Sequence, residues 1–401
     1  MDIAVIGGGP AGLFAAIHAS QSGKVTVLER GDTPGRKLLI TASGQCNLTH
    51  EGTPEEFLHR YQGKGEFLKS ALESFTPGET ISWFTRLGLK CTSDEDGKVF
   101  PASRRAADVL RVLTDQCAKF NVRIISDFRV NSASKTAGGF SLCCADGKTV
   151  RASRIIIATG GITCPATGSS GDGFKLAQSL GHRIVTPRLG LCGITAADHF
   201  LRPLSGVAFS SAVIRVSRNG RDICTHEGPL VITSKGFSGP AIVDRSSRMD
   251  AGDTITIDFT GSRQAFIKRV IELASLRGSR QLATVIHEAG IPRSLVSCML
   301  QHAGIDGARK SAEVSKKQLL GTANLFTSSS FTIAQVGDLF TAMVTAGGVD
   351  TSEVNHRTME SLLTPGLFFA GEVLDIDGES GGYNLQAAWS TGALAGRSCL
   401  A

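Results

Sequence analysis

The residues of this chain best suited to chemistry form a glycine turn near its start. Gly7, Gly9 and Gly12 have the spacing G-x-G-x-x-G, with Pro10 and Ala11 between the last two. In such a turn the first glycine permits the tight bend, the second lets the backbone approach a pyrophosphate, and the third lets a helix pack closely. The partial positive charge at the N-terminus of that helix also favours a pyrophosphate. The turn therefore predicts a dinucleotide site.

The segments around the turn have the order that this function requires. Residues 3–6 form a short apolar run typical of a buried parallel strand, and residues 13–19 have helix-forming composition. A second strand is expected at 25–28. It ends at Glu29, about twenty residues beyond the turn, where a carboxylate accepts hydrogen bonds from a ribose 2′-hydroxyl. Because that carboxylate would repel a 2′-phosphate, the bound adenosine should be unphosphorylated.

A second glycine-rich stretch, near the C-terminus, indicates a flavin. Residues 366–370 form an apolar strand that runs into Gly371-Glu372, and residues 382–386 precede a helix-like run at 387–395. In many nucleotide-binding flavoproteins a late strand ending in Gly-Glu meets the flavin ribityl chain, and the next helix directs its N-terminus at the isoalloxazine. Such a helix end stabilises negative charge on a reduced flavin. Taken alone, the stretch also fits a simple glycine turn between a strand and a helix.

The composition of the 401 residues is that of a compact α/β enzyme with more than one domain. Hydrophobic residues make up 41% and charged residues 19%, with 47 glycines. No basic region precedes an apolar segment at the start, and no apolar run approaches the length of a membrane span. The ten cysteines include no C-x-x-C spacing, which excludes ordinary zinc sites and favours reduced thiols. We therefore expect a cytoplasmic protein without a metal site or a membrane partner.

The domain organisation is indicated by changes in composition along the chain. Residues 189–261 contain many short β-like runs, and residues 262–339 are mostly helical in pattern. The final segment, 340–401, returns to the glycine-rich α/β character of residues 1–188. We therefore expect a nucleotide-binding domain made of 1–188 and 340–401, interrupted by an inserted β-rich domain that carries a basic helical subdomain.

The helical segment concentrates the positive charge of the chain. Between residues 262 and 320 there are ten basic and four acidic side chains, an excess equal to the net charge of +6 of the whole chain. A solvated helical face is the preferred explanation, and a surface for a polyanion such as RNA is the alternative. Phe266 is the only aromatic residue in this interval, so a base-stacking platform is not expected there.

Longer strings of sequence carry a resemblance to a known family. The chain resembles the BaiN-like NAD(P)/FAD-dependent oxidoreductase family over nearly its whole length, including relatives that resemble aminoacetone oxidases and ribosomal RNA dihydrouridine synthases. The strings that carry it are Gly35-Arg36-Lys37, residues 43–49, Ala158-Thr159-Gly160-Gly161 with Pro165, Gly168 and 171–173, then 233–240, 346–349, 358–361, 365–375 and 381–386. The resemblance implies an α/β fold with a Rossmann-like FAD-binding domain of the two-dinucleotide-binding-domain flavoprotein type. An inserted β-barrel-like domain with a helical subdomain is also implied.

The resemblance extends the set of expected FAD contacts beyond the glycine turn and Glu29. The complete set is Gly7, Gly9, Pro10, Ala11, Gly12, Glu29, Arg30, Arg36, Lys37, Ser43, Gly44, Cys46, Asn47, Val130, Thr159, Gly160, Gly371, Glu372, Gly382, Tyr383, Asn384, Leu385 and Gln386. The chain departs from the family pattern at Gln45, where an arginine is usual, and at Ser234, where a histidine is usual. No catalytic acid is carried over from the family for this reason.

Two of these residues are catalytic candidates, and each has an alternative role. Tyr383 can be a proton donor beside the flavin or a ring that packs at its edge. Cys46 can be a redox thiol, although a packed loop residue is preferred because no partner cysteine lies near it in the sequence.

The expected function is that of an FAD-dependent oxidoreductase. Only one G-x-G-x-x-G follows a strand, so a second complete dinucleotide domain is not expected. NADH or NADPH is therefore expected to bind at the flavin face only transiently. Hydride would pass from nicotinamide through flavin N5 to an activated C=C bond of a small molecule, either an enone or a uracil-like ring. The alternatives are an aminoacetone-like amine oxidase that produces hydrogen peroxide, a flavoenzyme that forms dihydrouridine in RNA, and a flavin-binding protein without turnover. The sequence predicts no oligomeric state.

Overall fold

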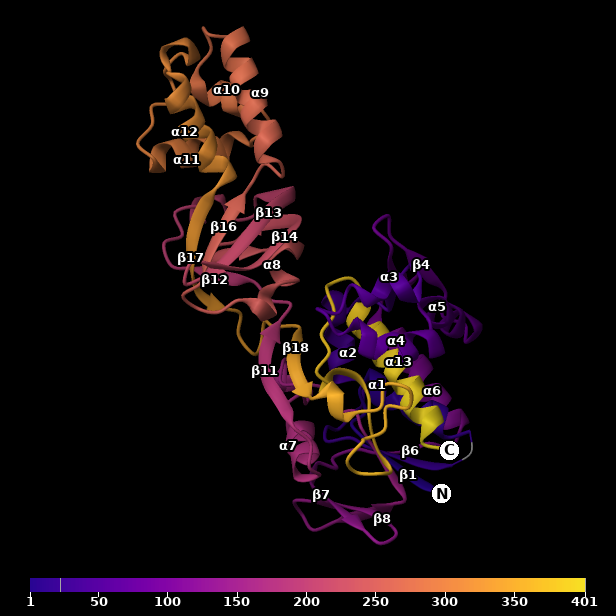
Figure 1. The fold of residues 1–401 in the computed structure, drawn as a ribbon. Coiled ribbons are helices and arrows are strands. Elements are labelled where there is room, and N and C mark those ends of the chain that lie inside the picture. The colour runs from indigo at the N-terminus through magenta and orange to yellow at the C-terminus, as the bar shows by residue number, and fades with distance from the viewer. Residues whose placement is uncertain (22, 401) are drawn as a thin grey trace. The chain divides into compact units, whose positions relative to one another are not determined.

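The computed structural model describes residues 1–21 and 23–400, which form two compact units. Unit 1 contains the described residues of 1–190 and 339–400, and unit 2 contains residues 191–338. Each unit has its own hydrophobic core, so each is built around a separate set of buried side chains. The chain therefore leaves unit 1 once, forms unit 2, and returns (Figure 1).

A five-stranded parallel sheet is the centre of unit 1. Its spatial order is β19-β10-β1-β2-β6, and every pairing in it is parallel. Val5 in β1 pairs with Val27 in β2 and with Ile156 in β10, and all three are fully buried or nearly so. Apolar runs of this kind suit strands covered on both faces. The strands are β1 (Asp2–Ile6), β2 (Lys24–Leu28), β6 (Arg123–Ile125), β10 (Arg154–Ile157) and β19 (Leu367–Phe369).

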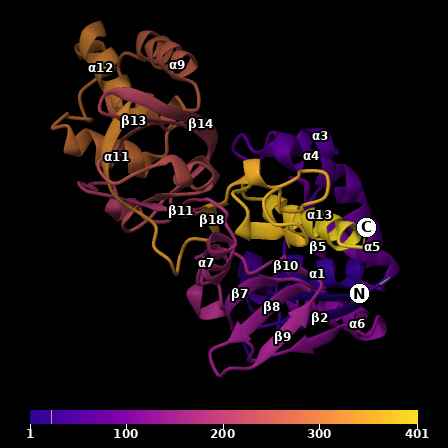
Figure 2. The same ribbon diagram turned by 60° about the horizontal axis from the view of Figure 1, so that its bottom comes forward.

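Two helices far apart in the sequence pack against each other in unit 1. Helix α1 (Pro10–Ala19) lies beside α13 (Tyr383–Ser398), as Figures 1 and 2 both show. A Cβ atom on Gly392 would lie 2.7 Å from the Ala11 oxygen, and one on Gly396 would lie 2.4 Å from the Ala15 oxygen. The two glycines in α13 therefore permit a close approach that larger residues would prevent.

Smaller elements surround this centre in unit 1. Its other helices are α2 (Arg36–Ile40), α3 (Pro54–Leu58), α4 (Gly65–Ser74), α5 (Pro77–Arg86), α6 (Ala106–Lys119) and α7 (Asp172–Ser179). One antiparallel sheet has the order β3-β5-β4, with β3 (Thr49–His50), β4 (Cys91–Ser93) and β5 (Lys98–Pro101). Another, clear in Figure 2, contains β7 (Val130–Thr136), β8 (Gly139–Cys144) and β9 (Thr149–Ala152). Strands β11 (Ile184–Gly190) and β18 (Val344–Val349) form an antiparallel pair.

Unit 2 is a closed β-barrel with a group of helices inserted between two of its strands. The barrel order is β12-β15-β14-β13-β16-β17, with β12 (Ile194–Ala196), β13 (Ala208–Arg218), β14 (Arg221–Ile232), β15 (Gly236–Ser238), β16 (Thr254–Asp258) and β17 (Ser329–Val336). The short helix α8 (Pro240–Val243) follows β15. Between β16 and β17 lie α9 (Arg263–Leu276), α10 (Leu282–Glu288), α11 (Arg293–His302) and α12 (Lys316–Thr327). The predicted fold class, a Rossmann-like domain with an inserted barrel and a helical subdomain, is confirmed.

One buried histidine in α1 makes the stability of unit 1 depend on pH. His18 packs against the rings of Phe14 and Phe75, and neither of its ring nitrogens has a hydrogen-bond partner among the described residues. Burial, with a smaller effect of the positive charge of Arg397, lowers the pKa of His18 to about 3. Below pH 6.5, the ordinary pKa of histidine, the unfolded chain therefore binds a proton at His18 that the folded chain does not bind. The free energy of unfolding falls as the pH falls from this value toward 3.

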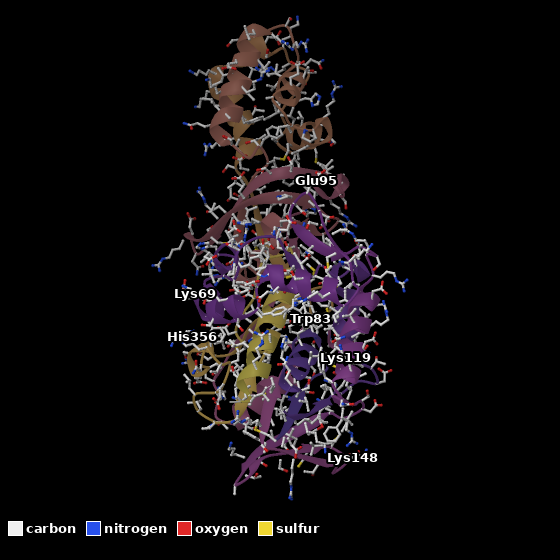
Figure 3. All side chains as sticks on the ribbon, turned by 90° about the vertical axis from the view of Figure 1, so that its right-hand side faces the viewer. Lys69, Trp83, Glu95, Lys119, Lys148 and His356 are labelled. Atoms are coloured by element: carbon white, nitrogen blue, oxygen red, sulfur yellow. The ribbon has the colours of Figure 1, made fainter. Side chains whose placement is uncertain are left out.

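We expect His18→Phe to remove much of this acid sensitivity. Between pH 7 and pH 5 the parent should lose about 2 kcal/mol more free energy of unfolding than the variant. Urea unfolding at the two pH values measures the difference. Trp83, labelled in Figure 3, provides the control, because it packs on the same Phe14 ring and has no titratable group, so Trp83→Phe should keep the acid sensitivity of the parent. Equal acid sensitivity of His18→Phe and the parent would contradict the prediction.

Candidate functional site

A pocket in unit 1 lies where the carboxyl ends of the central strands meet the glycine turn. Its wall includes Ile6 at the end of β1, Leu28 at the end of β2 and Ala158 after β10. Ligands of open α/β sheets bind at this edge. The expected contacts that line this pocket are Gly7, Gly9, Pro10, Ala11, Glu29, Arg30, Arg36, Lys37, Val130, Thr159, Gly160, Glu372, Asn384 and Leu385.

The three glycines of the turn have different surroundings. Gly7 has a φ of +105°, and a Cβ atom on it would lie 2.6 Å from the Ala158 oxygen. On Gly12 a Cβ atom would lie 1.9 Å from the Gly7 oxygen, whereas on Gly9 it would meet nothing within 4 Å. The protein itself therefore fills the space at Gly7 and Gly12 and leaves the space beside Gly9 open.

The N-terminus of α1 next to this open space has no capping side chain. Gly9 is its N-cap residue, and its first turn contains no acidic residue. The backbone N–H groups at the start of a helix need partners, and an anion provides them. The open space at Gly9 and this uncapped helix end together fit a pyrophosphate.

Glu29 joins the two turns that border the pocket. Its side chain is 8% exposed, and its two oxygens accept hydrogen bonds from the N–H groups of Gly8 and Gly31, both at 2.7 Å. Each carboxylate oxygen can accept a second hydrogen bond, so a ribose hydroxyl can still bind there. Glu29 therefore has a structural role at the position where the adenosine ribose is expected.

Ion pairs fix one rim of the pocket. Asp172, at the start of α7, accepts hydrogen bonds from Nε and Nη2 of Arg129 at 2.8 Å each and from Nη1 of Arg30 at 3.1 Å. Partial burial opposes ionisation, but the two guanidinium groups hold the pKa of Asp172 below its ordinary value. Arg30 also donates to the Gly168 oxygen at 3.2 Å. This rim is therefore set by charge-assisted hydrogen bonds between segments distant in the sequence.

A second ion pair lies at another part of the wall. Lys37 Nζ contacts the two Glu372 oxygens at 3.0 and 2.9 Å and the Thr163 hydroxyl at 2.9 Å. The Thr345 N–H donates to Glu372 Oε1 at 2.9 Å. Thr163 and Thr345 are absent from the sequence-based set. Thr345 directly precedes the family string at 346–349, whereas no sequence signal marked Thr163.

Several expected contacts do not line this pocket: Gly12, Ser43, Gly44, Cys46, Asn47, Gly371, Gly382, Tyr383 and Gln386. Cys46 is completely buried, and burial raises the pKa of its thiol to about 12, which favours the packing role over a reactive thiolate. Tyr383 is 5% exposed, and its ring stacks on His50 at a centroid distance of 5.2 Å. Its surroundings favour packing as well.

Gln386 is engaged entirely by the protein. Its Oε1 accepts hydrogen bonds from the hydroxyls of Thr49 at 2.7 Å and Thr80 at 2.9 Å. Its Nε2 donates to the Phe75 oxygen at 3.1 Å and to the Ser390 hydroxyl at 2.9 Å. These bonds hold the first turn of α13, which presents Asn384 and Leu385 to the pocket.

The loop after α2 contains strained backbone, and its Gln45 lies beside a cation from another segment. Ala42 and Ser43 have φ values of +47° and +54°, a region that costs of order 1–3 kcal/mol for each such residue. At Gln45, where the sequence resemblance implies an arginine, the Arg104 guanidinium approaches Oε1 at 3.5 Å and lies 4.0 Å from the Phe100 ring centroid. A cation from another segment is therefore present beside Gln45.

Residues 1–21 and 23–400 lack two further kinds of site, one for a metal ion and one for a membrane span. Within these ranges no group of three His, Cys, Asp or Glu side chains is arranged to hold a metal ion. Nor does any helix there have both the length and the apolar character needed to cross a bilayer.

Comparisons with known proteins agree on a family over the whole chain. The family model of the HI0933-like protein Rossmann domain matches residues 1–398. A 3-dehydro-bile acid delta(4,6)-reductase from Clostridium scindens is 33% identical over 406 residues, covering 98% of each chain. A ribosomal RNA dihydrouridine synthase from Escherichia coli is also 33% identical, over 97% of this chain and 96% of its own.

A solved structure shows the same fold at low identity. The 3-ketosteroid delta1-dehydrogenase from Sterolibacterium denitrificans superimposes with a TM-score of 0.53 and 13% identity, covering 99% of each chain. At this identity the likeness concerns the fold alone.

Proposed function

Because the chain belongs to the HI0933-like family and is therefore an FAD-dependent oxidoreductase, we propose that it reduces an activated C=C bond with NADH or NADPH as the hydride donor. The substrate is an enone or a uracil-like ring. The observation that carries this proposal is the 33% identity, over nearly the whole chain, to two relatives. The name of one describes a delta(4,6)-reductase, and that of the other describes formation of dihydrouridine. Both are reductions of a conjugated C=C bond.

The pocket of unit 1 offers a binding group for each part of the cofactor. The N–H groups at the start of α1 would hold the pyrophosphate, and Glu29 would accept hydrogen bonds from the adenosine ribose. Helix α13 has no side-chain cap, and its positive end would stabilise negative charge on the flavin. Bound FAD supplies the hydride relay between nicotinamide and substrate. Neither Tyr383 nor Cys46 lines this pocket, so neither is proposed as the proton donor.

An anaerobic titration tests the proposal. Addition of NADH or NADPH to the purified protein should bleach the visible flavin bands, and addition of an enone or a uridine-containing RNA should restore them. Bands that persist with both nicotinamides would contradict the reductase. Peroxide formation from an amine and dioxygen would then support the aminoacetone-like oxidase, and a yellow protein inactive in both assays would support a non-catalytic flavin protein.

RNA is a second candidate for the substrate of the same reduction, and the helical part of unit 2 favours it. All ten basic side chains between residues 262 and 320 are exposed, and the relative from Escherichia coli is a ribosomal RNA enzyme by name. Reversing the charges of Arg309, Lys310, Lys316 and Lys317 should weaken RNA binding and flatten its dependence on salt. Unchanged affinity would contradict this role for the basic helices.

A further inference from the structure

Three rings from separate parts of unit 2 form a continuous stack. Phe200, in the connection between β12 and β13, lies parallel to His302 at the end of α11, with a centroid distance of 3.7 Å and an interplanar angle of 3°. The other neighbour of Phe200 in the stack is Phe331 in β17, at 5.5 Å and 20°. Within residues 262–320 the one Phe, Phe266, is buried, and the two Phe rings of this stack come from outside that segment.

A cavity of about 440 Å³ lies beside this stack, within the size range of about 300–1,000 Å³ typical of ligand sites. Its wall is built by the first turn of α9, the ends of α11 and α12, the start of β17, and Phe200. The residues that line it are Phe200, Arg263, Met299, His302, Asn324, Leu325, Ser328, Ser329 and Ser330. None of these lining residues is acidic.

The charges around the cavity favour an anionic ligand. Arg263 is exposed at the rim, where its Nη2 donates to the Asn324 side-chain oxygen at 3.2 Å. The wall thus combines the Phe200 and His302 rings, an arginine and small polar side chains. This combination suits a nucleotide, since a base stacks on a ring such as that of the exposed His302 and a phosphate pairs with a cation.

We propose that this cavity is a binding site for one nucleotide of a single-stranded RNA. The base contacts the Phe200–His302 stack, and the adjoining phosphate pairs with Arg263. This site in unit 2 is separate from the pocket of unit 1. The choice of RNA as the partner rests on the proposed function, in which RNA is the second candidate substrate. The binding itself does not depend on the reduction of a C=C bond.

Fluorescence anisotropy with a short, labelled, single-stranded RNA tests the site without any nicotinamide, so a failure of the reductase assay leaves this result interpretable. His302→Ala and Arg263→Glu should each weaken binding by roughly five- to a hundredfold. The two variants should differ in salt dependence. Loss of the phosphate contact in Arg263→Glu lowers the slope of log affinity against log salt by about 0.7, whereas His302→Ala leaves the slope unchanged.

Matched variants and a second measurement keep the test decisive. Lys69→Glu and Lys119→Glu in unit 1, both labelled in Figure 3, make the same charge change as Arg263→Glu and should leave the affinity within about twofold. His302→Phe keeps a stacking ring and should retain binding. Ultraviolet cross-linking of the unmodified protein should label the peptide containing Phe200 or that containing His302. Unchanged affinity in both cavity variants, cross-links confined to other peptides, or free uridine monophosphate binding as tightly as the RNA would overturn the proposal.

Discussion

Gly12→Ala is expected to yield little folded protein, whereas Gly9→Ala should fold like the parent and lose FAD. An alanine Cβ at position 12 would lie 1.9 Å from the Gly7 oxygen, and both backbones are held by the central sheet and α1. Relief of that overlap requires movement of the helix, which should lower the free energy of unfolding by more than about 3 kcal/mol. Yield and urea unfolding of the two variants measure this difference.

Gly9→Ala is the matched control because its new methyl group meets nothing within 4 Å and its φ of −77° suits any residue. The methyl group instead enters the space that the pyrophosphate needs. We therefore expect the far-ultraviolet circular dichroism of the parent and a colourless protein. A stable Gly12→Ala would contradict the packing at the turn, and a yellow Gly9→Ala would contradict the placement of the pyrophosphate.

Glu29→Ala should weaken FAD binding and destabilise unit 1 together. The change removes the acceptor expected for the ribose hydroxyls, at about 1.5–3 kcal/mol of FAD binding, or roughly 10- to 150-fold in affinity. The same change leaves the N–H groups of Gly8 and Gly31 without their acceptor. Fluorescence titration of the apoprotein with FAD, together with urea unfolding of that apoprotein, separates the two effects.

Glu29→Gln tests which property of the side chain matters. The amide has the same shape but keeps only one acceptor oxygen, so one of the two backbone N–H groups should lose its partner. Its FAD affinity should fall between those of the parent and Glu29→Ala. FAD binding by Glu29→Ala as tight as that of the parent would place the adenosine elsewhere.

The sequence was informative where function depends on neighbouring residues. The strand at 3–6, the glycine turn, the helix and Glu29 occupy one short segment, and each has a local signal in residue type or spacing. The fold class followed from this unit together with the family strings. The left-handed conformation of Ala42 and Ser43 has no such signal, since neither residue type favours positive φ.

Side-chain direction was the part that motifs did not reveal. Gln386 belongs to a string expected at the flavin, yet the Thr49 and Thr80 hydroxyls bind its amide inside the protein. Contacts between segments far apart in the sequence also could not be predicted from the motifs. Lys37 and Glu372 were both expected at the cofactor, but their mutual pairing was not, because residues more than three hundred positions apart share no local pattern.

The return of the chain from unit 2 has a consequence for the order of events during synthesis. The strands and helices of unit 2 all lie between residues 194 and 336. Two elements of unit 1 come later in the chain: β19, which is an edge strand of the central sheet, and α13, which packs against α1. Domains fold as units while the ribosome is still translating. Unit 2 can therefore complete its barrel while the first half of unit 1 still lacks an edge strand and the helix that covers α1. The pocket of unit 1 is therefore completed only after unit 2 has been synthesised, when Ala370, Asn384 and Leu385 join its wall.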